Sequence, residues 1–137
     1  MLDIKGLTKI FSPGTINEKT ALDHVDLSLA SGDFVTIIGS NGAGKSTLMN
    51  CIAGVHSVDE GTIILDGQDI TRLPEHKRAK QIGRVFQDPL KGTAFDMTIE
   101  ENLSIAYNKN RSRGLQWGIS RKDRELFREK LRLLDMG

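Results

Sequence analysis

Eight consecutive residues have the types and spacing of a phosphate-binding loop. They run Gly-Ser-Asn-Gly-Ala-Gly-Lys-Ser and satisfy the pattern G-x-x-x-x-G-K-[ST]. Gly39 and Gly44 let the backbone wrap tightly and bring its N–H groups against phosphate oxygens, and Gly42 adds further freedom. We therefore predict that this loop binds the phosphates of a nucleotide.

The end of the loop supplies a cation and a hydroxyl with separate predicted roles. Lys45 is expected to reach the β- and γ-phosphates, and the Ser46 hydroxyl to ligate Mg²⁺. Thr47 is a further possible phosphate contact. A helix that begins near Lys45 would turn its unsatisfied amide donors and its positive end toward the same anion. The predicted site comprises Gly39, Ser40, Asn41, Gly42, Ala43, Gly44, Lys45, Ser46 and Thr47.

The elements around the loop follow from local sequence patterns. An apolar run at 34–38 predicts a buried strand that leads into the loop, and the absence of Gly and Pro over 45–53 predicts a helix that Gly54 ends. Turn residues Asp66-Gly67 predict a hairpin. The remaining expected elements are antiparallel strands 2–11 and 22–29, hairpin strands 62–65 and 68–70, a short helix 74–80 and a buried strand 82–86. Thr98 with Glu101 has the capping-box pattern for a helix to about Tyr107, and Ser120 with Asp123 caps a predicted helix containing Phe127, Leu131 and Leu134.

Composition and charge favour a water-soluble protein. The chain has 137 residues, of which 27% are charged and 38% hydrophobic, with a formal net charge of +1. It has no secretory signal pattern and no apolar stretch near the ~20 residues that span a bilayer. Nine of the 19 Lys and Arg residues lie between Lys109 and Arg132, but acidic residues interrupt them. We expect a solvated helical face there, and no nucleic-acid partner.

Three segments, in order, resemble the ATP-binding subunits of ABC transporters. The segment 40–48 with Ile52-Ala53-Gly54 is similar to the Walker A region of that family, and the hairpin 61–67 and the segment Val85-Phe86-Gln87-Asp88-Pro89 resemble two later regions. The resemblance covers essentially the whole chain, although its last third is less distinctive. It implies ATP and Mg²⁺ as the ligands of the loop.

The resemblance also implies the fold and its division. We expect an α/β P-loop NTPase core of ABC type, with an antiparallel β subdomain and the start of a helical subdomain. Residues 1–95 would form the nucleotide-binding core with the β subdomain, P-loop and Q-loop, and residues 96–137 would begin the helical subdomain. The segment 90–103 resembles the region that meets membrane subunits.

Two residues outside the loop receive roles from the resemblance alone. Phe11 occupies the place of the aromatic that stacks on adenine, although it could instead be core at a strand end. Gln87 resembles the Q-loop glutamine, which approaches Mg²⁺ and the attacking water, with a surface-turn glutamine as the alternative. Ser46 and Gln87 are the implied metal ligands, and Gln87 is the implied catalytic residue.

Complete members of the family carry segments that this sequence lacks. A Leu-Ser-Gly-Gly-Gln-like signature, a Walker B strand ending in Asp-Glu and a switch histidine are absent. Ile63-Ile64-Leu65-Asp66 resembles a Walker B strand, but Gly67 stands where the glutamate belongs. We expect a truncated chain without a general base, which binds ATP but does not hydrolyse it.

The implied function is the ATP-binding subunit of an ABC transporter, which couples ATP hydrolysis to solute transport. The implied partners are membrane permease subunits and a second ATP-binding subunit. The implied location is cytoplasmic, peripheral on the inner face of the cell membrane. Two alternatives stay open at this point. The chain could be a nucleotide-binding module without hydrolysis, or part of a soluble ABC-type ATPase of translation or DNA repair.

Overall fold

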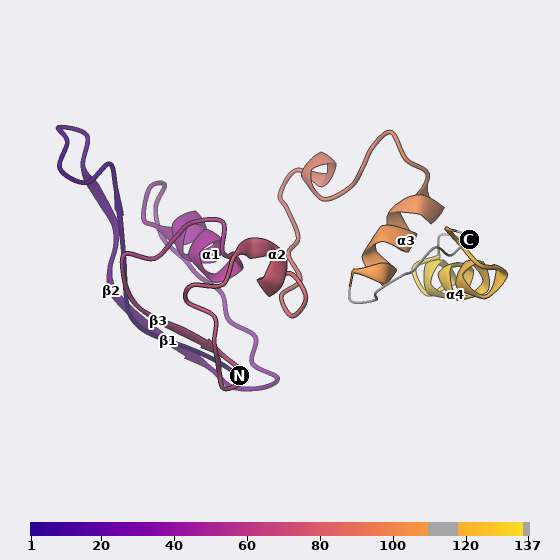
Figure 1. Ribbon diagram of the computed structural model, residues 1–137, viewed down its shortest axis with the longest axis horizontal. Coiled ribbons are helices and arrows are strands. Elements are labelled where there is room, and N and C mark those ends of the chain that lie inside the picture. Colours follow the sequence, from indigo (N-terminus) through magenta and orange to yellow (C-terminus); the bar gives the residue numbers. More distant parts are fainter. Residues whose placement is uncertain (110–117, 136–137) are drawn as a thin grey trace. The chain divides into compact units, whose positions relative to one another are not determined.

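A computed structural model of the chain describes residues 1–109 and 118–135 (Figure 1). The chain divides into two compact units, Met1–Gly83 and Arg84–Gly137, and each is described by itself. The division at residue 95, which concerns functional domains of the family, stays a prediction.

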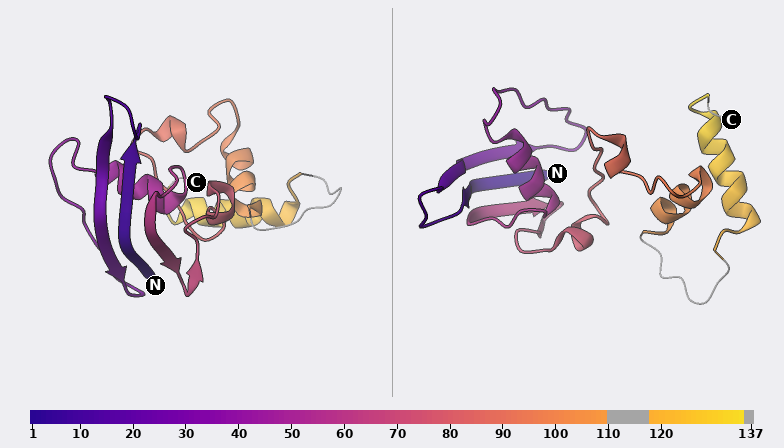
Figure 2. Two further views of the ribbon diagram at one scale, coloured as in Figure 1. Left: turned by 60° about the vertical axis from the view of Figure 1, so that its left-hand side comes forward. Right: turned by 90° about the horizontal axis from the view of Figure 1, so that it is seen from above.

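The first unit is built on a four-stranded antiparallel sheet. Its strands are β1 (Leu2–Phe11), β2 (Lys19–Leu29), β3 (Glu60–Leu65) and β4 (Gln68–Asp69), in the order β2-β1-β3-β4 (Figure 2). The predicted hairpin at Asp66-Gly67 is confirmed. Both turn residues have positive φ, 48° at Asp66 and 80° at Gly67, as a two-residue hairpin of type I′ requires.

Helix α1 (Lys45–Ala53) packs its apolar side against this sheet, and the short helix α2 (Glu75–Arg78) follows β4. Cys51 on α1 belongs to the buried core, since its side chain is fully buried. Burial of these apolar side chains is the main favourable term that holds α1 in place. The buried core comprises Ile4, Leu7, Leu22, Leu48, Cys51, Val58, Ile63 and Ile70.

Glycines in the left-handed backbone conformation cap both ends of α1. Gly44 is the N-cap residue with φ 83°, and Gly54 is the C-cap residue with φ 85°. The Gly54 N–H donates to the carbonyls of Asn50 and Cys51, which satisfies acceptors that the last helical turn leaves open. The helix predicted over 45–53 is thus confirmed, with the end that Gly54 indicates.

The two predicted buried strands at 34–38 and 82–86 are wrong, because neither segment forms a strand in the structure. Several of their apolar side chains are exposed, with Phe34 at 93% and Val85 at 97% of full exposure, whereas Ile82 and Phe86 are half-buried. A strand needs a neighbour that pairs with its backbone, and no described residue pairs with either segment. An apolar run indicates a tendency to be buried but does not supply the neighbour.

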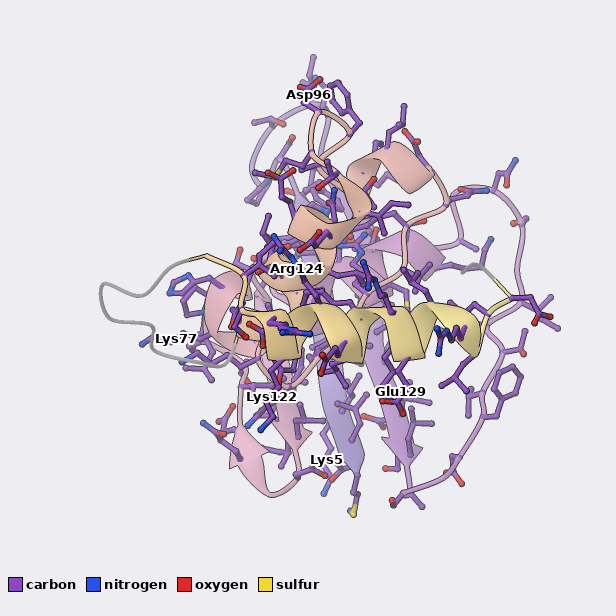
Figure 3. The ribbon with its side chains drawn as sticks, turned by 90° about the vertical axis from the view of Figure 1, so that its right-hand side faces the viewer. Lys5, Lys77, Asp96, Lys122, Arg124 and Glu129 are labelled. Carbon is purple, nitrogen blue, oxygen red and sulfur yellow. The ribbon has the colours of Figure 1, made fainter. Side chains whose placement is uncertain are left out.

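The second unit contains a 3₁₀ turn (Pro89–Lys91) and the helices α3 (Ile99–Asn108) and α4 (Arg121–Arg132). Both predicted capping boxes are confirmed: Thr98 with Glu101 begins α3, and Ser120 with Asp123 begins α4. The helices pack through an edge-on contact of Tyr107 with Phe127, and the guanidinium of Arg124 (labelled in Figure 3) pairs with Glu100. The helix predicted to include Leu134 ends at Arg132. In the described parts of both units, every helix is too short or too polar to cross a bilayer.

Candidate nucleotide-binding site

The glycine loop connects the exposed segment before it to the first turn of α1. The Ala43 N–H donates to the carbonyl of Ser40 at 3.2 Å, which makes a tight turn within the loop. The first helical hydrogen bond runs from the Leu48 N–H to the Gly44 carbonyl at 2.8 Å. The amides of Lys45, Ser46 and Thr47 therefore precede the first helical bond, and no acidic residue lies in this first turn. This arrangement offers N–H donors and the positive helix end to an anion.

The ammonium group of Lys45 lies over the start of the loop. Its Nζ donates to the Gly39 carbonyl at 2.6 Å and to the Ser40 carbonyl at 2.7 Å. Two charge-assisted hydrogen bonds fix the position of this cation relative to the loop backbone. The side chain is half-buried, whereas Gly39, Ser40, Asn41, Gly42 and Ala43 are exposed.

Gly44 has no room for a side chain. A Cβ at this position would lie 2.4 Å from the Ala21 carbonyl oxygen and 3.1 Å from Leu22 Cδ2, both on β2. Its positive φ would strain any other residue as well. Gly42 also has positive φ, 85°, but a Cβ there would meet only Lys19 Nζ, at 4.0 Å. The two glycines thus have different structural roles: Gly44 leaves space for the close approach of β2, whereas Gly42 is needed for the backbone conformation of a turn.

A buried arginine holds the opposite end of α1. Arg78 is 2% exposed, and burial lowers the pKa of its guanidinium, although the group keeps its charge at neutral pH. A cation beside the carbonyl end of a helix is favourable because the helix dipole is negative there. Its donors reach four carbonyl oxygens: Leu73 at 2.7 Å, Cys51 at 2.7 Å, Ile52 at 2.9 Å and Thr71 at 3.0 Å.

Phe11 ends β1 and is half-buried. Its ring makes an edge-on contact with His56, with centroids 5.3 Å apart, and Lys9 Nζ lies 5.6 Å from its centroid. Lys19 is its partner across the β1–β2 pair. Because Lys19 Nζ also lies near Gly42, the end of this strand pair lies close to the glycine loop.

The remaining candidate residues differ in what surrounds them. Ser46 is exposed and Thr47 half-buried, both in the first turn of α1. Gln87 is exposed and belongs to the second unit, next to Phe86, whose ring Arg84 covers at 4.6 Å. Its predicted role in water and metal positioning stays a prediction.

Sequence patterns indicated the loop but missed Lys19 and Arg78. Lys19 is one of 19 basic residues, and only the pairing register places it opposite Phe11. The hydrogen bond from Arg78 to Cys51 crosses 27 positions of the chain, so no local pattern could reveal it.

Among the described residues, no cluster of three or more His, Cys, Asp or Glu could hold a metal ion by itself. A site of the predicted kind does not need such a cluster, because Mg²⁺ in nucleotide sites takes many ligands from phosphates and water. The exposed hydroxyl of Ser46, beside the amide donors of the loop, suits that donor set.

Comparisons with known proteins agree on one family. The family model described as ABC transporter matches residues 22–136. The tyrosine transport ATP-binding protein of Clostridioides difficile (strain R20291) is 44% identical over 126 residues, which cover 92% of this chain and 50% of that protein. An energy-coupling factor transporter ATP-binding protein of Acetivibrio thermocellus is 36% identical over 104 residues, covering 76% of this chain and 37% of that protein.

A solved structure shows the same fold. The dimeric structure of MJ0796, described as a bacterial ABC transporter cassette, matches with a TM-score of 0.77 and 29% sequence identity. The match covers 98% of this chain and 57% of that chain. The chain thus spans about half the length of the first curated relative and of this structure.

Proposed function

This chain belongs to the ABC transporter family of ATP-binding cassettes, and from that membership we propose that it is the ATP-binding part of a transporter's ATP-binding subunit. The complete subunit would couple ATP binding and hydrolysis to movement of a solute across a membrane. The alternative of a soluble ATPase in translation or DNA repair has no specific support from the curated relatives described above, whose names refer to transport.

One observation carries the proposal: the ammonium of Lys45 is fixed over a glycine loop that opens into a helix start without acidic residues. Loop amides, helix end and lysine all present positive charge at one place. A polyphosphate is the anion whose length and charge suit such an array. The loop amides of 39–44 and the first turn of α1 would hold the phosphate oxygens, with Lys45 at the β- and γ-phosphates.

Mg²⁺, when bound, would neutralise charge on the phosphate oxygens. Ser46 would supply a hydroxyl ligand to it, and Gln87 would approach both the metal and the attacking water. Thr47 would contact the phosphates from the same turn. Phe11 would offer its ring to adenine, where stacking gives affinity without hydrogen bonds.

We further propose that the 137-residue chain alone binds ATP but does not hydrolyse it. Its sequence contains no Leu-Ser-Gly-Gly-Gln-like signature and no Walker B strand, so it supplies no general base of the family's kind. In the complete protein, a second ATP-binding subunit and membrane permease subunits would be the partners. That assembly would place the protein at the inner face of the cell membrane.

The test is a pair of measurements on the full chain in the presence of Mg²⁺. Calorimetric titration with ATP is expected to show saturable binding, and an assay of released phosphate is expected to show no turnover above a protein-free blank. A chain that is folded by circular dichroism but binds no ATP would contradict the first part of the proposal. Turnover that persists after removal of trace ATPases would contradict the second.

A further inference from the structure

Lys19 lies outside the glycine-loop motif, and the motif does not require a positive charge at this position. It begins β2, is exposed, and pairs across the strands with Phe11. Its Nζ lies 4.0 Å from the place where a Cβ on Gly42 would be. The backbone of Lys19 thus lies beside the end of β1, while its ammonium lies beside the middle of the glycine loop.

The surroundings of Lys19 leave its charge uncompensated. The adjacent carboxylate, Glu18, turns back and accepts a hydrogen bond from the Gly14 N–H at 2.7 Å. Within residues 1–109 and 118–135, no carboxylate forms an ion pair with Lys19. Lys45 and the helix start add positive charge to the same loop. Like charges gathered at one place repel unless an anion lies among them.

We propose that Lys19 is a second cation of the nucleotide site, which contacts the nucleotide between its base and its terminal phosphates. The assignment rests on the proposed function. If Phe11 meets the base and Lys45 meets the β- and γ-phosphates, the ribose and the α-phosphate lie between them. Lys19 is the partner of Phe11 and the neighbour of Gly42, so its ammonium is placed for that middle part.

The position makes a specific prediction about which nucleotides respond to Lys19. ATP and ADP share the ribose and the α-phosphate and differ only in the γ-phosphate. Loss of the Lys19 charge should therefore lower the affinities for ATP and for ADP by the same factor. A charge-assisted contact of an exposed side chain corresponds to about a three- to tenfold change in affinity.

The experiment compares ATP and ADP affinities of the full chain with those of three variants. Lys19→Gln removes the charge, Lys19→Arg keeps it, and Lys77→Gln removes the charge of the exposed residue Lys77 on α2 (Lys77 is labelled in Figure 3). Helix α2 lies against Gly54, at the far end of α1 from the loop, which makes Lys77 a matched control. We expect Lys19→Gln to bind ATP and ADP more weakly by the same factor, and the other two variants to bind both with affinities close to wild type.

The outcomes separate the two claims. Wild-type affinities in Lys19→Gln, or equal losses in Lys19→Gln and Lys77→Gln, would overturn the Lys19 assignment and leave the proposed function intact. A loss confined to ATP would place Lys19 at the γ-phosphate and overturn it as well. A folded wild-type chain that binds neither nucleotide would overturn the proposed function and, with it, the role of Lys19.

Discussion

Arg78 Nη1 donates a 2.7 Å hydrogen bond to the carbonyl oxygen of Cys51, across 27 positions of the chain. The contact joins the short helix α2 to the last turn of α1, whose first turn follows the glycine loop. The same guanidinium binds Ile52, Thr71 and Leu73 through their carbonyl oxygens. One buried side chain thus ties the far end of α1 to the segment after β4.

Replacing Arg78 with Met should destabilise the chain by about 2–4 kcal/mol, because buried carbonyl oxygens would lose their donors. Arg72→Met is the matched control, since Arg72 is exposed and makes a single hydrogen bond within the described residues, to Val58 at 3.4 Å. The control should lose less than ~1 kcal/mol. Urea denaturation of both variants measures the difference, and equal midpoints would contradict the proposed importance of Arg78.

Gly44→Ala should be more destabilising than Gly42→Ala. Both substitutions place alanine at positive φ, which costs about 1–2 kcal/mol, but only the first forces a methyl group against the Ala21 carbonyl, at 2.4 Å. We expect a loss of at least ~3 kcal/mol for Gly44→Ala, by adding a collision to the backbone strain. Denaturant titration of both variants measures their free energies of unfolding. A smaller loss of stability in Gly44→Ala than in Gly42→Ala would contradict this packing.

Asp59 links the end of β1 to the segment before β3. One carboxylate oxygen accepts from the Ile10 N–H at 2.6 Å, and Lys9 Nζ lies 3.1 Å from the carboxylate. The backbone hydrogen bond, with the charge of Lys9, lowers the pKa of Asp59 below its ordinary value of 3.8. The folded state therefore favours the ionised form.

The sign of the pH dependence follows from this lowered pKa. The stabilisation from Asp59 is present in full above the ordinary value of 3.8 and is lost as the pH falls through the lower pKa of the folded state. Asp59→Asn should cost ~1 kcal/mol at pH 7 and lose less stability than wild type on acidification. Denaturant titrations from about pH 6 to pH 2.5 check this. Asp96→Asn, which removes an exposed carboxylate (labelled in Figure 3), should keep the wild-type acid dependence.

Local signals in the sequence predicted the elements that local interactions stabilise. Gly54 indicated the end of α1, Thr98 with Glu101 indicated the start of α3, and Asp66-Gly67 indicated the hairpin. In each case the residues that make the stabilising contact are within a few positions of one another. The tight turn of the glycine loop and its junction with α1 are local in the same way, whereas the binding of phosphate there stays a prediction.

Features that depend on distant partners could not be predicted in the same way. The apolar run 34–38 resembles a buried strand, yet a strand forms only where a neighbour pairs with its backbone. The neighbourhood of Lys19 depends on the register of β1 and β2, and the contacts of Arg78 depend on how α2 meets α1. Residue type alone does not distinguish these two cations from the other basic residues.

The central claim is that the glycine loop with Lys45 binds the phosphates of ATP, and titration of ATP into wild type, Lys45→Ala and Lys5→Ala tests it most directly. Lys5 is an exposed lysine on β1 that pairs with Asp3 at 3.5 Å, so its variant controls for loss of one positive charge. We predict at least a tenfold loss of affinity, about 1.4 kcal/mol, for Lys45→Ala and none for Lys5→Ala. Unchanged ATP affinity in a folded Lys45→Ala variant would contradict the claim.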